Sequence, residues 1–336
     1  MKDSDIKKLS KQKQLIFATT TVIVCVGVTL LALEVLVRIF RPGMGDLAKI
    51  VTQASGSDSR PYSLKPGAQV GFRGYYKSLK KPAVWEINAQ GIRSDRPMPP
   101  RSKKFRIFTF GDSETFGWAV PLAFTFQRRM EQIDDNVEVI NLGTPGYNAE
   151  NIADHMKEVL AHLGADIVLY IAHRNDVDPT LTYSPILAKS YFLVYINVKH
   201  PRLLRYIFPE LKERRHSPEK LKYFVNQVDR MIDICQRENV PLLIGFLDWR
   251  FAKALPPPFR IDHFQTLKKS VDTVLDKPVF RVGSVNIEHG WMTLPRIDDH
   301  MSQAGHQETA EKICLAISAG KKHSCVPPYW HPTRDQ

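Results

Sequence analysis

Residues 104–113, KFRIFTFGDS, decide the fold. Apolar and aromatic side chains run up to Phe110, as in a strand buried in a protein core, and Gly111 ends the run. A polar Asp112-Ser113 pair follows at once. In open α/β sheets the working site lies outside the carboxyl ends of the strands, so this junction is a candidate site as well as a structural landmark.

Downstream of this junction, apolar strands alternate with helices. Further strands are expected at residues 137–142, 167–172, 242–247 and 279–282. Helices are expected at residues 125–133, 149–163, 218–238, 263–275 and 303–317. The alternation predicts an α/β fold with three α/β/α layers, a mostly parallel sheet of flavodoxin-like type covered by helices on both faces.

Polar residues stand at the carboxyl end of each early strand. The first strand ends in Gly111-Asp112-Ser113, and the next is followed by residues 141–146, NLGTPG. The third is followed by residues 173–176, HRND, and the loop before the last helix holds residues 298–300, DDH. These groups are expected to meet at one edge of the sheet.

This set of residue types suits acyl transfer. A serine hydroxyl needs a neighbouring base, which His300 can supply to Ser113. Asp298 lies two residues before His300 and faces the same side in an extended segment, so it can orient the imidazole, whereas Asp299 points away. The developing oxyanion needs donors, and the candidates are the backbone N–H of Ser113, Gly146 with Gly143 in the same turn, and the side-chain amide of Asn175.

The four motifs, in this order, resemble the GDSL/SGNH hydrolase family over residues 105–317. The resemblance implies Ser113 as the nucleophile and His300 as the base, with Asp298 as its acid partner. It also implies Gly146 and Asn175 as oxyanion donors, an ester substrate, and neither a metal nor a cofactor.

The chain departs from this family at two positions. His173 stands where the family usually has glycine, two residues before the asparagine, and Ile297 stands where the usual acid precedes the histidine by three. Membrane-anchored bacterial members resemble the chain in an Asp-x-His arrangement and a downstream Gly305-His306. Residues 62–67, YSLKPG, and 87–93, INAQGIR, also resemble those members, with no known mechanistic role.

The N-terminal part is predicted to be a membrane anchor. Residues 15–33 carry no charge, and a run of this length is close to what a helix needs to cross a bilayer. Five lysines precede this run, so the positive-inside rule places the N-terminus in the cytoplasm. Glu34 and Arg38 are spaced to pair along the helix. The expected location is the inner membrane, single-pass, with the catalytic domain extracytoplasmic, and periplasmic in a Gram-negative bacterium.

The resulting organisation has five parts. We expect a cytoplasmic basic tail at residues 1–14, a transmembrane signal anchor at 15–40, a stalk with irregular strands at 41–100, the catalytic domain at 101–320 and a C-terminal tail at 321–336. In an oxidising compartment Cys314 and Cys325 could form a disulfide. Three free buried thiols, with Cys235, are the other possibility left open.

Three functions compete. The first is a serine esterase that acts on an acylated carbohydrate or another ester, and the second is an O-acyltransferase that passes the acyl group to an exopolysaccharide hydroxyl. The third is a non-catalytic envelope binding or assembly protein. The net charge of +12 favours anionic partners, but an extracytoplasmic location excludes nucleic acid. The 43% hydrophobic content excludes a wholly disordered chain and a collagen.

Overall fold

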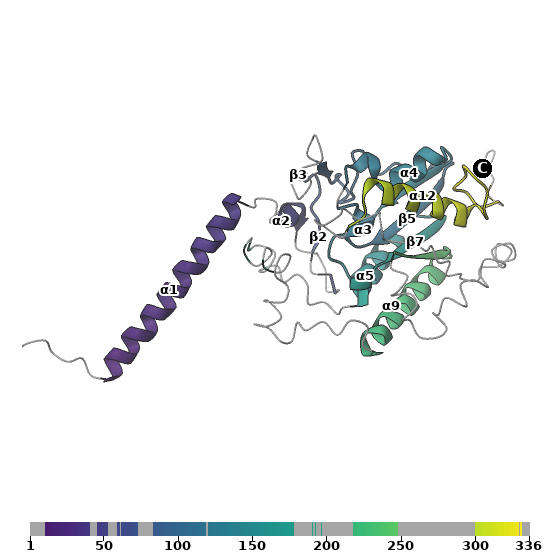
Figure 1. Ribbon diagram of the computed structural model, residues 1–336. Helices are drawn as coiled ribbons and strands as arrows, with labels where there is room; N and C mark the ends of the chain where they lie inside the picture. Colours follow the sequence, from purple (N-terminus) through teal and green to yellow (C-terminus); the bar gives the residue numbers. More distant parts are fainter. Residues whose placement is uncertain are drawn as a thin grey trace, which may run out of the picture.

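The computed structural model describes residues 11–40, 46–52, 59–60, 62–72, 83–118, 120–177, 218–247 and 300–328, with the single residues 190, 192, 196 and 330. The predicted α/β fold is confirmed: a parallel sheet lies between two layers of helices (Figure 1). The helix expected at residues 263–275 and the strand expected at 279–282 lie outside the described residues.

Four strands form the main sheet, in the order β6-β5-β7-β8 and all parallel. Their bounds are Phe105–Gly111 for β5, Val137–Asn141 for β6, Ile167–Ala172 for β7 and Leu242–Phe246 for β8. The order reverses beside β5, because β6 pairs with one edge of β5 and β7 with the other. Ligand sites of doubly wound sheets lie at this switch point, outside the carboxyl ends of the strands.

Alternate residues of a strand enter different cores, so the strands are buried on both faces and most of their residues are apolar. On β5, Phe108 and Phe110 pack into the core under α5 and α9, whereas Phe105 and Ile107 pack under α4 and α12. Figure 1 shows α5 and α9 on one side of the sheet and α4 and α12 on the other.

The helices follow the expected positions with small changes at their ends. Their bounds are Ser113–Phe116 for α3, Phe126–Ile133 for α4, Ala149–Leu160 for α5, Pro218–Arg237 for α9 and Gln303–Ile317 for α12. Two 3-10 turns, η2 (Leu122–Phe124) and η3 (Arg174–Val177), complete the domain. A capping box between Asn148 and Asn151 starts α5.

Short strands precede the main domain. Strand β1 (Val51–Thr52) pairs with β2 (Ser63–Leu64), and β3 (Gln69–Phe72) pairs with β4 (Ala83–Glu86); both pairs are antiparallel. The short helix α2 (Asp46–Ile50) directly precedes β1. Trp85 on β4 is fully buried and packs with Phe116, the last residue of α3, and with Val120, which lies just after α3. The N-terminal region therefore packs against the same turn that carries Ser113.

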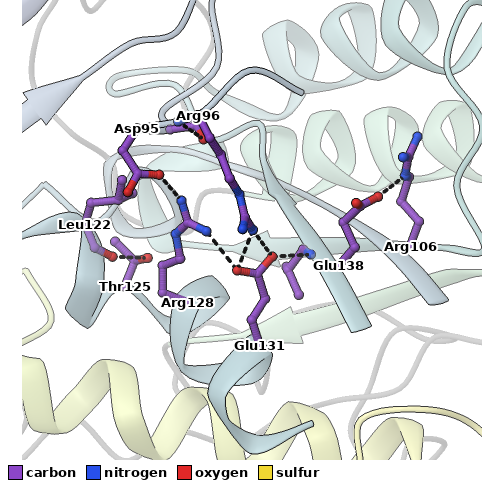
Figure 2. Close-up of polar contacts among 10 residues, drawn as sticks. Asp95, Arg96, Arg106, Leu122, Thr125, Arg128, Glu131 and Glu138 are labelled. Carbon is purple, nitrogen blue, oxygen red and sulfur yellow. Dashed lines mark hydrogen bonds and ion pairs between the residues drawn. The ribbon is translucent and has the colours of Figure 1, made fainter. Parts of the chain in front are cut away.

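Ion pairs fasten the segment before β5 to the main domain (Figure 2). Arg96 reaches Glu131 on α4 at 2.8 Å, and Arg128, on the same helix, bonds both Glu131 and Asp95. Glu131 Oε1, the oxygen that Arg96 contacts at 2.8 Å, also accepts the N–H of Val139 on β6 at 3.1 Å. One carboxylate thus connects the segment before β5, helix α4 and strand β6.

The N-terminal helix α1, Lys11–Phe40, projects away from the domain (Figure 1). Within Lys13–Phe40, a window of 18 residues has a mean hydropathy of 2.5 and is 6% buried, so the helix is long and apolar enough to cross a membrane. The predicted pair along the helix is confirmed, with Arg38 Nε 2.7 Å from Glu34 Oε1. The second oxygen of Glu34 accepts the Ser190 hydroxyl at 2.8 Å, so this part of the helix contacts a residue far along the chain.

A disulfide joins Cys314 on α12 to Cys325, the first of the two possibilities that the sequence left open. The N–H of Cys325 also donates to Asp134, just after α4, at 2.9 Å. Cys235 is a buried free thiol on α9. The end of α12 is therefore fixed covalently to the C-terminal segment and, through Asp134, to α4.

Candidate active site

The turn after β5 carries Ser113. An added Cβ at Gly111 would lie 2.0 Å from Thr115 Oγ1, so only glycine lets the strand run so close to the start of α3. Asp112 caps this helix, because its carboxylate accepts the N–H of Glu114 at 2.8 Å. Ser113 is held as the first residue of α3, half-buried at the carboxyl edge of the sheet.

His300 lies directly against this serine. Its Nε2 is 2.8 Å from Ser113 Oγ, although 187 positions separate the two residues in the chain. With the serine hydroxyl as donor, Nε2 is the acceptor and Nδ1 faces away to be oriented by another group. The ring of Trp118 stacks against the imidazole, with centroids 6.2 Å apart and planes at 28°. This is the geometry of a serine with its general base.

A buried acid ties the serine turn to the histidine loop. Glu114, directly after Ser113, is 2% exposed, and its carboxylate accepts the N–H of Met301 at 3.0 Å. Burial raises the pKa of Glu114, and the charge of His300 opposes that rise. Sequence reasoning missed this residue, although an acidic side chain in the otherwise apolar stretch after the serine was a signal.

The third strand end places Asn175 beside the serine turn. Its amide Nδ2 donates to Asp112 at 2.8 Å, while its Oδ1 lies 2.7 Å from Nδ1 of His173. His173 Nδ1 is also 3.4 Å from Asp112 Oδ2. Burial disfavours a charged imidazole, but Asp112 outweighs it and raises the pKa of His173 to about 9. The pKa of Asp112 stays below its usual range despite burial, because His173, Glu114 N–H and Asn175 all stabilise the carboxylate.

A second carboxyl group lies behind this cluster. Asp176 is fully buried and accepts both the Tyr170 hydroxyl at 2.6 Å and the N–H of His173 at 2.9 Å. Burial, together with the charge of Asp112, raises the pKa of Asp176 to about 8. Asp176 therefore holds a proton at neutral pH, which leaves Asp112 and His173 as the charged pair.

The turn after β6 brings the predicted glycines to the site. Gly146 has φ +81°, a conformation that favours glycine, in a turn fixed by the N–H of Thr144 on the Gly111 carbonyl at 3.0 Å. Gly143 serves differently from the sequence interpretation. Its N–H donates to the Asn141 side chain at 3.1 Å, and an added Cβ would lie 2.3 Å from the backbone nitrogen of Phe116. Gly143 provides a close approach to α3, with its N–H already engaged.

The two N-terminal motifs that had no assigned role each contact one loop of the site. Tyr62, from YSLKPG, donates its hydroxyl to the carbonyl of Pro145 at 2.5 Å, next to Gly146. The hydroxyl of Tyr147 donates in return to the carbonyl of Tyr62. This reciprocal pair fixes the glycine turn from outside the main domain.

Arg93, from INAQGIR, supports the serine helix. Its guanidinium is 1% exposed and donates to the carbonyls of Phe116, Gly117 and Val120, the last at 2.7 Å. It also lies over the Phe116 ring, 4.5 Å from the centroid. Burial lowers the pKa of Arg93 to about 9. The carbonyls at the end of α3 thus obtain donors from a residue twenty positions upstream of the serine.

Two further aromatic side chains near the site, His306 and Trp85, have packing roles. His306 on α12 is buried against the Phe126 ring and accepts the N–H of Phe126 at 3.2 Å, and burial lowers its pKa to about 3. Trp85 is fully buried, 4.1 Å from the Trp118 ring centroid. Neither faces the Ser113–His300 contact as a second base or as an exposed sugar-binding surface.

The predicted acid lies outside the described residues, as do Asp299 and Ile297 beside it. The structure therefore places Ser113, His300, Asn175, Gly143 and Gly146 around one sheet edge and does not place Asp298. Within the part of the chain that the structure describes, no group of His, Cys, Asp and Glu side chains could hold a metal ion.

No family model and no curated protein matches the chain. Several solved structures do match the chain, and they include lipolytic proteins of the G-D-S-L family.

One, from Veillonella parvula, is 12% identical and covers 63% of this chain and 98% of its own, with a TM-score of 0.39. Another, from Desulfitobacterium hafniense, is 13% identical and covers 62% of this chain and 97% of its own, with a TM-score of 0.37. The esterase EstA from Pseudoalteromonas sp. is 10% identical and covers 62% of this chain and 94% of its own, with a TM-score of 0.38.

Proposed function

We propose that the chain is a serine esterase that cleaves an O-acyl ester through a covalent acyl-enzyme on Ser113. The observation that carries this proposal is the 2.8 Å contact between His300 Nε2 and Ser113 Oγ at the carboxyl edge of a parallel sheet. A serine becomes a good nucleophile when an adjacent base accepts its proton, and this contact supplies the base.

The reaction proceeds in two similar steps. Ser113 Oγ attacks the ester carbonyl carbon as its proton passes to His300 Nε2. The tetrahedral oxyanion takes hydrogen bonds from the backbone N–H groups of Ser113 and Gly146 and from the Asn175 amide. When the carbon–oxygen bond of the ester breaks, the alcohol leaves with the proton from His300. Water then attacks the acyl-enzyme in the same way and releases the acid and free Ser113.

We assign the acid partner of His300 to Asp298. An extended segment puts residues two apart on the same side, so the Asp298 carboxylate can reach Nδ1, while Asp299 faces the other way. Its role is to keep the imidazole in the tautomer that accepts at Nε2 and to stabilise the imidazolium formed during attack.

The location that we propose is the inner membrane, with the catalytic domain on the extracytoplasmic side. Helix α1 supports the anchor by its length and hydropathy, and the five lysines that precede residue 15 support the orientation. The Cys314–Cys325 disulfide supports an oxidising compartment. An acylated envelope or exopolysaccharide carbohydrate is the substrate that fits this location. A sugar hydroxyl in place of water would make the same acyl-enzyme an O-acyltransferase.

The experiment is active-site labelling of the full-length protein in detergent with a fluorophosphonate probe. Wild type should be labelled on Ser113, and Ser113→Ala should lose both the label and the hydrolysis of a short-chain aryl ester. Ser102→Ala, which removes an exposed serine before β5, is the matched control and should behave as wild type. Undiminished hydrolysis by Ser113→Ala would refute the proposal and favour the non-catalytic envelope protein.

A further inference from the structure

The hydrogen bonds around Asn175 determine which way its amide faces. Asp112 is an ionised carboxylate and can only accept, so the atom 2.8 Å away from it is the amide nitrogen, as the structure has it. The amide oxygen then faces His173 Nδ1 at 2.7 Å. Because an amide oxygen can only accept, Nδ1 of His173 must carry a proton. Asp112 and His173 thus hold the two ends of the amide.

The surroundings keep this arrangement in place. The charged and titratable groups that face His173 are Asp112 from the end of β5, Glu114 from α3 and Asp176 from η3. Asp112, Glu114 and Asp176 are each at most 2% exposed. The N–H of His173 is fixed on Asp176 at 2.9 Å, so both the backbone and the ring of this histidine are anchored. The side chains of Asp112, His173 and Asn175 hold one another in this buried network, in which Asp176 Oδ1 is left without a hydrogen-bond partner.

We propose that His173 is a positioning residue of the oxyanion site. Its Nδ1–H holds the Asn175 oxygen, Asp112 takes one amide hydrogen, and the second amide hydrogen is thereby aimed at the substrate oxyanion. This inference rests on the proposed esterase function. It gives a role to a residue that departs from the glycine usual at this position of the family.

The test is a double-mutant cycle on ester hydrolysis with full-length protein in detergent. His173→Phe keeps a ring of similar size but removes the donor, and Asn175→Ala removes the oxyanion group. We expect His173→Phe to lower kcat by up to about 10²-fold with little change in KM, because one oxyanion donor is worth about 10²–10³-fold. The double variant should be no slower than Asn175→Ala, since His173 acts through Asn175. Multiplicative losses in the double variant would overturn the proposal, as that is the result of a purely structural role.

His155→Phe is the matched control. This half-buried histidine on α5 contacts the rings of Phe110 and Tyr147, outside the site, and its replacement should leave kcat unchanged. If His173→Phe does not fold, wild type answers the question by NMR of protein carrying ¹⁵N-histidine. We expect a protonated Nδ1 on the histidine whose resonance shifts in Asn175→Ala, and an unprotonated Nδ1 at neutral pH would overturn the proposal.

The labelling experiment separates the two proposals. If wild type is labelled on Ser113 and His173→Phe turns over as fast as wild type, the positioning role is refuted and the esterase function stands. If wild type is neither labelled nor active, the esterase function fails and the positioning role fails with it.

Discussion

The carboxylate of Glu114 accepts the backbone N–H of Met301 at 3.0 Å. Glu114 follows Ser113 and Met301 follows His300, so one hydrogen bond joins the residue after the proposed nucleophile to the residue after the proposed base. The His300–Ser113 contact at 2.8 Å is thus the second of two links between the same loops. The distance between base and nucleophile depends on a side chain that touches neither reacting atom.

Glu114 variants should show whether turnover depends on the hydrogen bond to Met301 or on the negative charge of Glu114. Glu114→Gln keeps an acceptor of the same length and should retain most of kcat for an aryl ester. Glu114→Leu removes the acceptor, so the His300 loop can shift, and a displacement of about 1 Å can cost about 10²-fold in turnover. Equal kcat values for the Gln and Leu variants, both folded by circular dichroism, would contradict the link.

Arg93 should be a large contributor to stability. Arg93→Met leaves the carbonyls of Phe116, Gly117 and Val120 without their donor. Each buried unsatisfied group costs about 1–3 kcal/mol, so we expect a loss of about 3 kcal/mol or more in the free energy of unfolding. Urea denaturation measures this value.

Arg96→Met is the control for that measurement. The Arg96 side chain is 53% exposed and pairs with Glu131 at the surface, so its removal should cost less than about 1 kcal/mol. Arg93→Met with the same stability as Arg96→Met would refute the role of Arg93. Arg93→Lys should fall between, because an ammonium group cannot span three carbonyls.

Stability should fall as the pH rises from about 6.5 to about 9. The pKa of His173 is raised from 6.5 to about 9, so its stabilisation is complete below pH 6.5 and is lost as the pH passes about 9. The pKa of Asp176 is raised from 3.8 to about 8, so the folded protein keeps a proton that the unfolded chain releases, and stability also falls between pH 3.8 and 8. The two slopes have the same sign.

Thermal unfolding from pH 6 to pH 9 measures that dependence. The melting temperature of wild type should decrease across this range, and the decrease should be smaller in His173→Phe, which has no imidazole to deprotonate. A melting temperature that rises with pH in wild type would show that the charged pair is assigned wrongly.

Asp298→Asn should separate the acid from its neighbour. Without a carboxylate the His300 imidazole is poorly oriented and its charged form is not stabilised, and losses up to about 10⁴-fold in turnover are the scale for triads. Asp299→Asn should be mild, since its side chain faces away in an extended segment. A severe Asp299→Asn with a mild Asp298→Asn would reverse the assignment, and the loop would not be extended there.

The sheet and the meeting of Ser113 with His300 were predictable from sequence. Buried parallel strands are continuous apolar runs, and their carboxyl ends share one edge, so Ser113 and Asn175, which follow such runs, converge there. His300 stands in the loop before the last helix and was assigned as the base by its residue type. The expected bounds of β7, Ile167–Ala172, and of α12, Gln303–Ile317, are those of the structure. Here the period of the sequence and the physics of burial specify the same answer.

The supports of the site were not predictable in the same way. His173 stood out only as a bulky departure, because nothing local indicates that its ring meets Asn175 and Asp112. Arg93 lies on a turn before the domain, and the carbonyls that it serves are identified only by tertiary structure. Periodicity reports which face of an element is buried, whereas these contacts join polar atoms from different elements.

The close approach of Gly143 to α3 limits which amino acids codon 143 can encode. Every other amino acid carries a Cβ, and at this position that atom would lie 2.3 Å from the nitrogen of Phe116 and 2.7 Å from the carbonyl carbon of Thr115, both backbone atoms. Neither can rotate aside as a side-chain tip would. Codon 143 is therefore closed to missense change while α3 keeps its place, and a saturation library at this position, selected for activity, should return glycine alone.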